Sequence, residues 1–121
     1  MPDNWSSVEA EVDRIVAASD PPFASETIAH IGDFLKYLRE RTAAPKVGRG
    51  YWPTLNIWWE YAAAREPATT AEFEVFAERI EVYRFRGRHT EGIQEIPHVA
   101  GEPFPQEIEA ALPKEIGRGK L

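Results

Sequence analysis

The sequence predicts an all-α domain, a compact bundle of about four helices followed by a proline-rich, mostly irregular C-terminal tail. Three observations lead to this prediction. Apolar residues recur at helical spacing in the first 88 residues, two Ser/Thr-x-x-Glu sequences match helix capping boxes, and proline and glycine separate the segments. We therefore expect one domain, with a helical core over residues 1–88 and a tail over residues 89–121.

Two helices are expected in the first 41 residues. The first follows the capping box that begins at Ser6, ends before Asp20-Pro21-Pro22, and buries one apolar stripe: Val8, Val12, Ile15 and Val16. The second is expected over residues 25–41, with another stripe: Ile28, Ile31, Phe34, Leu35 and Leu38. Basic residues in its last turn suit the carbonyl end of a helix.

Two further helices are expected between Pro53 and Gly87. The third runs over residues 54–65 and would be the most buried. The fourth follows a second capping box that begins at Thr69, and its apolar residues keep helical spacing: Phe73, Phe76, Ala77, Ile80 and Tyr83. Because the segment from Ile80 to Phe85 is rich in β-forming residues, a short strand there is the alternative, and the fold would then be α+β. One short helix is expected in the tail, over residues 106–112.

Composition excludes several classes of site and indicates a compartment. The chain has no cysteine, which excludes disulfides, thiolate metal ligands and cysteine nucleophiles. No signal-like start and no apolar run long enough for a membrane span are visible, so we expect a cytoplasmic protein with no membrane partner. The abundance of alanine and arginine indicates a bacterial or phage genome. Oligomeric state is not encoded in any pattern that we find.

The densest functional signal is aromatic. Three of the chain's four tryptophans lie between residues 52 and 59, more than one buried helix face accommodates. Trp52 precedes a proline and should be extended. The leading hypothesis is therefore a non-enzymatic protein-binding module, such as an adaptor, inhibitor or immunity-type protein, which masks a partner through an aromatic and arginine patch: Arg49, Tyr51, Trp52 and Trp59. The alternative is that these aromatic residues are buried in a hydrophobic core that surrounds the third helix on most sides.

Charge distribution supports a second hypothesis, a helical nucleic-acid-binding or regulatory domain. The net charge of −6 opposes binding to nucleic acid by bulk electrostatics, but two basic segments, residues 36–49 and 79–89, interrupt the acidic chain. The side chains that would contact phosphates are Arg39, Arg41, Lys46, Arg84, Arg86 and Arg88. The alternative reading is that these residues complement helix ends and need no partner.

A third hypothesis is a small-ligand-binding domain or enzyme with an aromatic pocket formed by Trp58, Trp59, Glu60 and Tyr61. We find no catalytic set, because the four serines lie near predicted helix ends, where capping explains them. Glu26, His30 and Asp33 share one helix face, but a solvated polar face is the simpler interpretation. We therefore expect no metal and no cofactor.

Overall fold

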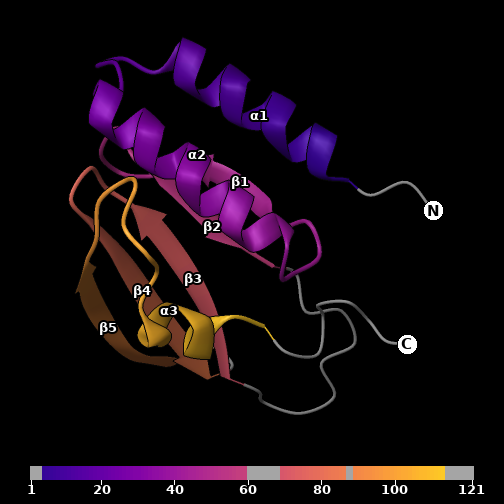
Figure 1. Ribbon diagram of the computed structural model, residues 1–121, viewed down its shortest axis with the longest axis vertical. Coiled ribbons are helices and arrows are strands. Elements are labelled where there is room, and N and C mark those ends of the chain that lie inside the picture. The colour runs from indigo at the N-terminus through magenta and orange to yellow at the C-terminus, as the bar shows by residue number, and fades with distance from the viewer. Residues whose placement is uncertain (1–3, 60–68, 87–88, 114–121) are drawn as a thin grey trace.

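The computed structural model describes residues 4–59, 69–86 and 89–113, without the side chains of residues 69, 70, 86 and 89. These residues form an α+β fold in which helices lie on one side of a five-stranded antiparallel sheet (Figure 1). The elements follow one another as α1 (Trp5–Ala18), α2 (Ser25–Arg39), β1 (Lys46–Arg49), β2 (Leu55–Trp58), β3 (Thr69–Val75), β4 (Arg79–Arg86), β5 (His89–Pro97) and α3 (Gln106–Ala111). The strand order in the sheet is the chain order, β1-β2-β3-β4-β5.

The prediction of an all-α, α-helical bundle is wrong. Strand β2 occupies the start of the predicted third helix. The predicted fourth helix is instead a hairpin formed by β3 and β4. The hairpin turns at Phe76, whose N–H donates to the Arg79 carbonyl at 2.9 Å. The alternative prediction, a short strand over residues 80–85, is confirmed. Strand β4 spans Arg79–Arg86 and is therefore slightly longer than predicted. The tail, expected to be mostly irregular, supplies β5 to the sheet.

Alternation of side chains explains these strands. Ala71, Phe73 and Val75 are buried on one face of β3, while Glu72 and Glu74 point to the other. Phenylalanine, valine, isoleucine and tyrosine also favour strands over helices where they pack on a pleated surface. The helical spacing of Phe73, Phe76 and Ile80 is a coincidence of two period-2 runs joined by a tight turn.

The register places apolar residues in rows across the helix-covered face of the sheet. Leu55 lies opposite Val75, Val75 opposite Ile80, and Ile80 opposite Ile96. All four side chains in this row are at most 5% exposed. Such rows fill the space between the sheet and the helices, and they fix the register, because a one-residue slip would turn every one of these side chains to the other face.

The helices cover that face in two groups. In Figure 1, α1 and α2 run side by side in opposite directions over one end of the sheet, and α3 lies in front of β3, β4 and β5 toward the other end. Contacts link α1 to β1 and α2 to β3. Phe34 of α2 is at the centre, fully buried, with its ring 5.3 Å from that of Phe73 and 5.6 Å from that of Phe104.

The first two predicted helices are confirmed, with differences at their ends. Helix α1 begins at Trp5, so Ser6 lies inside it and does not cap it; its N-cap, Asn4, makes no side-chain capping bond. Helix α2 begins at Ser25 as predicted and ends at Arg39. Ile28, predicted in the buried stripe, is 42% exposed. The short helix predicted in the tail is confirmed as α3.

Within the described residues, none of the three helices is both long enough and apolar enough to cross a membrane.

Candidate protein-binding site

The turn between β1 and β2, residues 50–54, presents two large aromatic side chains to solvent. Tyr51 is 83% exposed and Trp52 is 59% exposed, and their rings meet edge to face with centroids 4.8 Å apart. Exposure of two adjacent aromatic rings leaves much apolar area in contact with water, which is a known mark of interaction surfaces. We call residues 50–54 the aromatic turn.

Backbone hydrogen bonds hold the aromatic turn in one shape. The Gly50 N–H donates to the Thr54 carbonyl at 2.9 Å, and the Thr54 N–H donates to the Trp52 carbonyl at 2.6 Å. The Thr54 hydroxyl is also 2.5 Å from a carboxylate oxygen of Glu74 in the neighbouring strand β3. The turn is therefore fixed to the sheet, which lowers the entropy lost when its two rings are buried by a partner.

A polar cluster on the sheet face opposite the helices supports this attachment. The Tyr83 hydroxyl is 3.1 Å from Glu74 and 2.6 Å from Glu81, two carboxylates that are 7% and 8% exposed. Burial and the two neighbouring carboxylates raise the pKa of Tyr83 above its ordinary value, so the phenol stays neutral and remains a hydrogen-bond donor. The cluster gives Glu74 a fixed position beneath Thr54.

Gly50 is required by close packing at the base of the turn. A Cβ at this position would overlap the Thr54 hydroxyl and would lie 2.6 Å from a Glu74 carboxylate oxygen. We expect Gly50→Ala to lower the free energy of unfolding by about 1–3 kcal/mol, because the added methyl displaces a hydrogen-bonded pair. Denaturant titration measures this loss.

The control for that variant is Gly32→Ala. A Cβ at Gly32, within α2, meets no atom within 4 Å. The control should therefore raise stability by about 0.5–1 kcal/mol, since alanine is the better helix former. Equal effects of the two substitutions would contradict the packing that we describe at Gly50.

Arg49 lies at the foot of the aromatic turn but faces the helices. Its Nε donates to the Ser19 hydroxyl at 2.9 Å, and its guanidinium is 3.4 Å from the Gly50 carbonyl. The residue is exposed, so its charge is accessible to solvent at the base of the turn. Of the predicted patch, Arg49, Tyr51 and Trp52 lie within four consecutive positions and are exposed, and the side-chain contact among them is that of Tyr51 with Trp52.

Trp59 does not join the aromatic turn. It is 4% exposed, its indole Nε1 donates to the Ala43 carbonyl at 2.9 Å, and its ring meets Phe73 edge to face at 6.0 Å. The candidate site is thereby reduced to Arg49, Tyr51 and Trp52.

Trp58 and Trp59 do not form the aromatic pocket that the sequence predicted for residues 58–61. Trp58 is half-buried on the opposite sheet face, where its ring lies 3.3 Å from the place that a Cβ on Gly48 would occupy. Trp59, which directly follows β2, is buried against Phe73 on the helix-covered face, so Trp58 and Trp59 do not line one pocket. Glu60 and Tyr61 lie outside the described residues.

The two basic segments do not merge into one patch within the described residues. Arg39 pairs with Glu9 at 2.7 Å, Arg41 with Glu109 at 3.4 Å, and Arg84 donates to Gln94 at 2.9 Å. A guanidinium already satisfied by an acid or amide is a poorer phosphate contact. Lys46 is exposed on β1, which β2 and β3 separate from Arg84 on β4. The Arg86 side chain and Arg88 lie outside the described residues.

The predicted polar face of Glu26, His30 and Asp33 is not a ligand set. His30 is fully buried and bonded to His98, while Asp33 accepts a hydrogen bond from the Gly101 N–H at 2.7 Å. Among the described residues, no group of three or more potential ligand side chains is placed to hold a metal ion.

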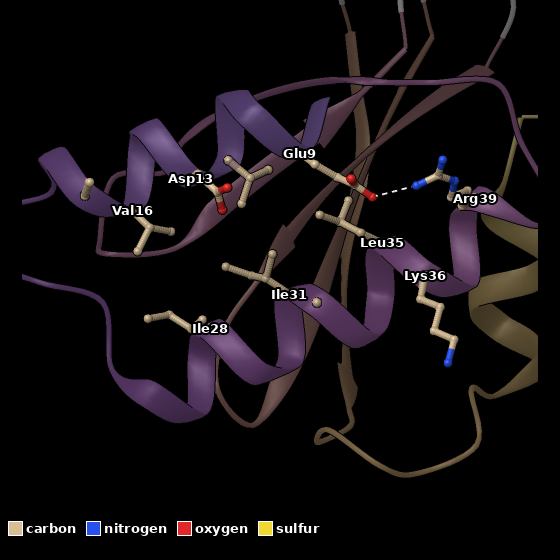
Figure 2. Close-up of a pocket in the computed structure, with 11 residues that line it drawn as sticks. Glu9, Asp13, Val16, Ile28, Ile31, Leu35, Lys36 and Arg39 are labelled. Atoms are coloured by element: carbon tan, nitrogen blue, oxygen red, sulfur yellow. Dashed lines mark hydrogen bonds and ion pairs between the residues drawn. The ribbon is translucent and has the colours of Figure 1, made fainter. Parts of the chain in front are cut away.

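A groove of about 550 Å³ runs between α1 and α2 and was not anticipated from the sequence (Figure 2). Figure 2 shows Val16 and Ile28 at one end and the Glu9–Arg39 ion pair at the other. The lining residues are Glu9, Val12, Asp13, Val16, Ala17, Ile28, Ile31, Gly32, Leu35, Lys36 and Arg39. Its apolar positions follow the same helical spacing as a buried stripe, which is why the sequence pattern did not distinguish it from the core.

Comparison with known proteins identifies no relative. A scan against models of protein families gave no match, and searches of curated proteins and of solved structures gave none either.

Proposed function

We propose that this protein is a non-enzymatic protein-binding module whose partner-binding anchor is the aromatic turn. The observation that carries the proposal is the pair Tyr51 and Trp52, 83% and 59% exposed on a turn that is hydrogen-bonded to the sheet. Tyrosine and tryptophan are the residue types most enriched where binding energy is concentrated, and each loses little conformational entropy on burial.

Electrostatics would orient the partner. Arg49 places a positive charge at the base of the aromatic turn, against the Gly50 carbonyl, in a chain whose net charge is −6. A complementary partner would bring an apolar pocket for Trp52 and an acidic group toward Arg49. Such charges raise the association rate and select the binding orientation more than they raise affinity.

Site-specific photo-crosslinking in the producing cell tests this function. A benzophenone amino acid replaces Tyr51, which keeps an aromatic ring at the position, and the matched control places it at Ile93, which is 60% exposed on β5. The proposal predicts a covalent adduct of defined mass from position 51 and none of that mass from position 93. Adducts that are equally abundant from both positions, or an absent adduct at position 51, would reject it.

A further inference from the structure

A continuous chain of hydrogen bonds joins three segments of the molecule through two buried histidines. His30 of α2 lies with its Nδ1 2.5 Å from the Phe76 carbonyl in the β3–β4 turn. Its Nε2 is 2.8 Å from Nδ1 of His98, and the Nε2 of His98 is 2.9 Å from the Glu102 carbonyl. His30 is 0% exposed and His98 is 3% exposed.

The atoms at the two ends of this chain fix the number of protons it needs. A carbonyl oxygen only accepts, so His30 Nδ1 and His98 Nε2 must each carry a hydrogen to bond Phe76 and Glu102. The contact between the two rings needs one more hydrogen. The chain is therefore complete with three hydrogens, whereas two neutral imidazoles bring two. All three bonds form together when the pair carries one positive charge.

The surroundings indicate which ring carries the charge. The His98 ring stacks on Phe104 with centroids 4.1 Å apart and planes at 22°, an arrangement that stabilises a cation over an aromatic face. Burial lowers the pKa of His30 below its ordinary value, and the neighbouring His98 lowers it further. In a pair that carries one positive charge, the neutral ring is therefore His30, whose Nε2 accepts the hydrogen bond from His98 Nδ1.

Acidic groups face the pair from each packed element. Asp33 lies on α2, Glu78 lies in the β3–β4 turn, and both act to raise the pKa of His30 against the effect of burial. Glu102 lies in the same segment as His98, and its carboxylate is 3.4 Å from the Val99 N–H. Arg79 pairs with Glu78 at 2.7 Å, which weakens the influence of that carboxylate on the histidines. The nearby charge thus favours one proton on the pair.

We propose that His30 and His98 form a proton-binding latch, in which one proton taken up by the pair fastens residues 98–104 to α2 and its loss releases the Glu102 carbonyl. A neutral pair forms two of the three bonds, and the third contact then brings together two atoms with lone pairs. The bond to the Glu102 carbonyl is the one that breaks, because Glu102 is exposed whereas Phe76 is partly buried. The latch is independent of the aromatic turn and of the function proposed for it.

Histidine-selective nitrogen NMR on the intact protein tests the latch, since ring nitrogens report tautomer and charge separately. From about pH 5 to about pH 8, we expect a state with a neutral His30 protonated on Nδ1 and a charged His98, which then loses one proton in a single coupled step. The Glu102 carbonyl carbon shift should move in the same step. Backbone order parameters of residues 99–102 should fall from about 0.85 toward about 0.6.

Two variants separate the latch from a general effect of pH. His98→Phe keeps a flat ring against Phe104 but binds no proton, and it should abolish the pH dependence of the order parameters. Glu102→Gln removes a carboxylate but keeps the carbonyl, and it should retain the titration step. If either variant fails to fold, the titration of the wild-type protein still tests the proposal by itself. The proposal would be overturned if both rings stayed neutral or if the two rings titrated independently. It would also be overturned if the chemical shift of the Glu102 carbonyl carbon did not change in the titration step.

The same geometry predicts the pH dependence of stability. His30 has an ordinary pKa of 6.5 in the unfolded chain and a lowered pKa in the folded one, so below pH 6.5 the unfolded state binds more protons. The contribution of His30 to stability is complete above pH 6.5 and is lost as the pH falls toward its folded pKa. Urea titrations at several pH values should show this slope in the wild type and a smaller slope in His30→Gln. Equal slopes would show that His30 does not titrate differently in the two states.

Discussion

Replacement of Phe34 by alanine is expected to lower the free energy of unfolding by about 3–5 kcal/mol. The side chain is fully buried between the helices and the sheet, with the rings of Phe73 and Phe104 at 5.3 Å and 5.6 Å. Removing it deletes the ring contacts that join α2 to β3 and to the segment before α3, and it leaves a cavity that the surrounding structure fills only in part. Denaturant unfolding of purified variants measures the loss.

Ile28→Ala provides the control on the same helix. Ile28 is 42% exposed at the end of the α1–α2 groove, so its truncation should change stability by no more than about 0.5 kcal/mol. If both substitutions cost the same, α2 would present a different face to the sheet from the one described.

Trp52→Ala is expected to weaken binding of the partner at least 30-fold, about 2 kcal/mol, while leaving the free energy of unfolding within about 0.5 kcal/mol of the wild type. Trp52 is 59% exposed and its ring contacts Tyr51, so the fold loses little when the ring is removed. Isothermal titration of the cross-linked partner measures the first effect, and denaturant unfolding measures the second.

Trp59→Ala is the matched comparison, since it removes the same side chain seven positions along the chain. Trp59 is 4% exposed and donates its indole N–H to Ala43. Its loss should cost about 3–5 kcal/mol of stability, as for other buried aromatic residues. A Trp52 variant that unfolds as readily as the Trp59 variant would place Trp52 in the core and remove the anchor.

The helices of the first 39 residues could be predicted because their signal is local. Val8 and Val12 in α1, and Ile31, Leu35 and Leu38 in α2, recur at the spacing of one helix face and are buried as expected. The capping box at Ser6 predicted the wrong first residue for this helix, because Trp5 is already helical and its side chain is buried.

The sheet could not be predicted with the same method because its strands are short and its turns lack the usual signals. Strand β2 has four residues, too few to show a period. The β3–β4 turn around Phe76 contains neither glycine nor proline, so one continuous helix fitted the apolar residues equally well. Pairing with the neighbouring strands of the sheet decides such cases, and local propensity does not contain it.

The candidate site was predicted in part. The surplus of aromatic residues and the extended conformation expected before Pro53 pointed to Tyr51 and Trp52, and both are exposed. Trp59 was misplaced because its exposure was inferred from a helix over residues 54–65, whereas residues 55–58 form strand β2 and Trp59 is 4% exposed. The bond between His30 and His98 joins residues 68 positions apart, and no pattern in the sequence links them.

The most direct measurement of the central claim is affinity capture from the producing cell with three baits side by side: wild type, a double variant with Tyr51→Ala and Trp52→Ala, and Ile93→Ala. Ile93 is 60% exposed on β5, so it controls for the loss of any exposed apolar group. The captures are treated with nuclease and quantified by mass spectrometry. The account predicts a protein that is recovered equally by wild type and Ile93→Ala and is depleted from the double variant. Equal recovery by all three baits would show that the aromatic turn is not where this protein binds.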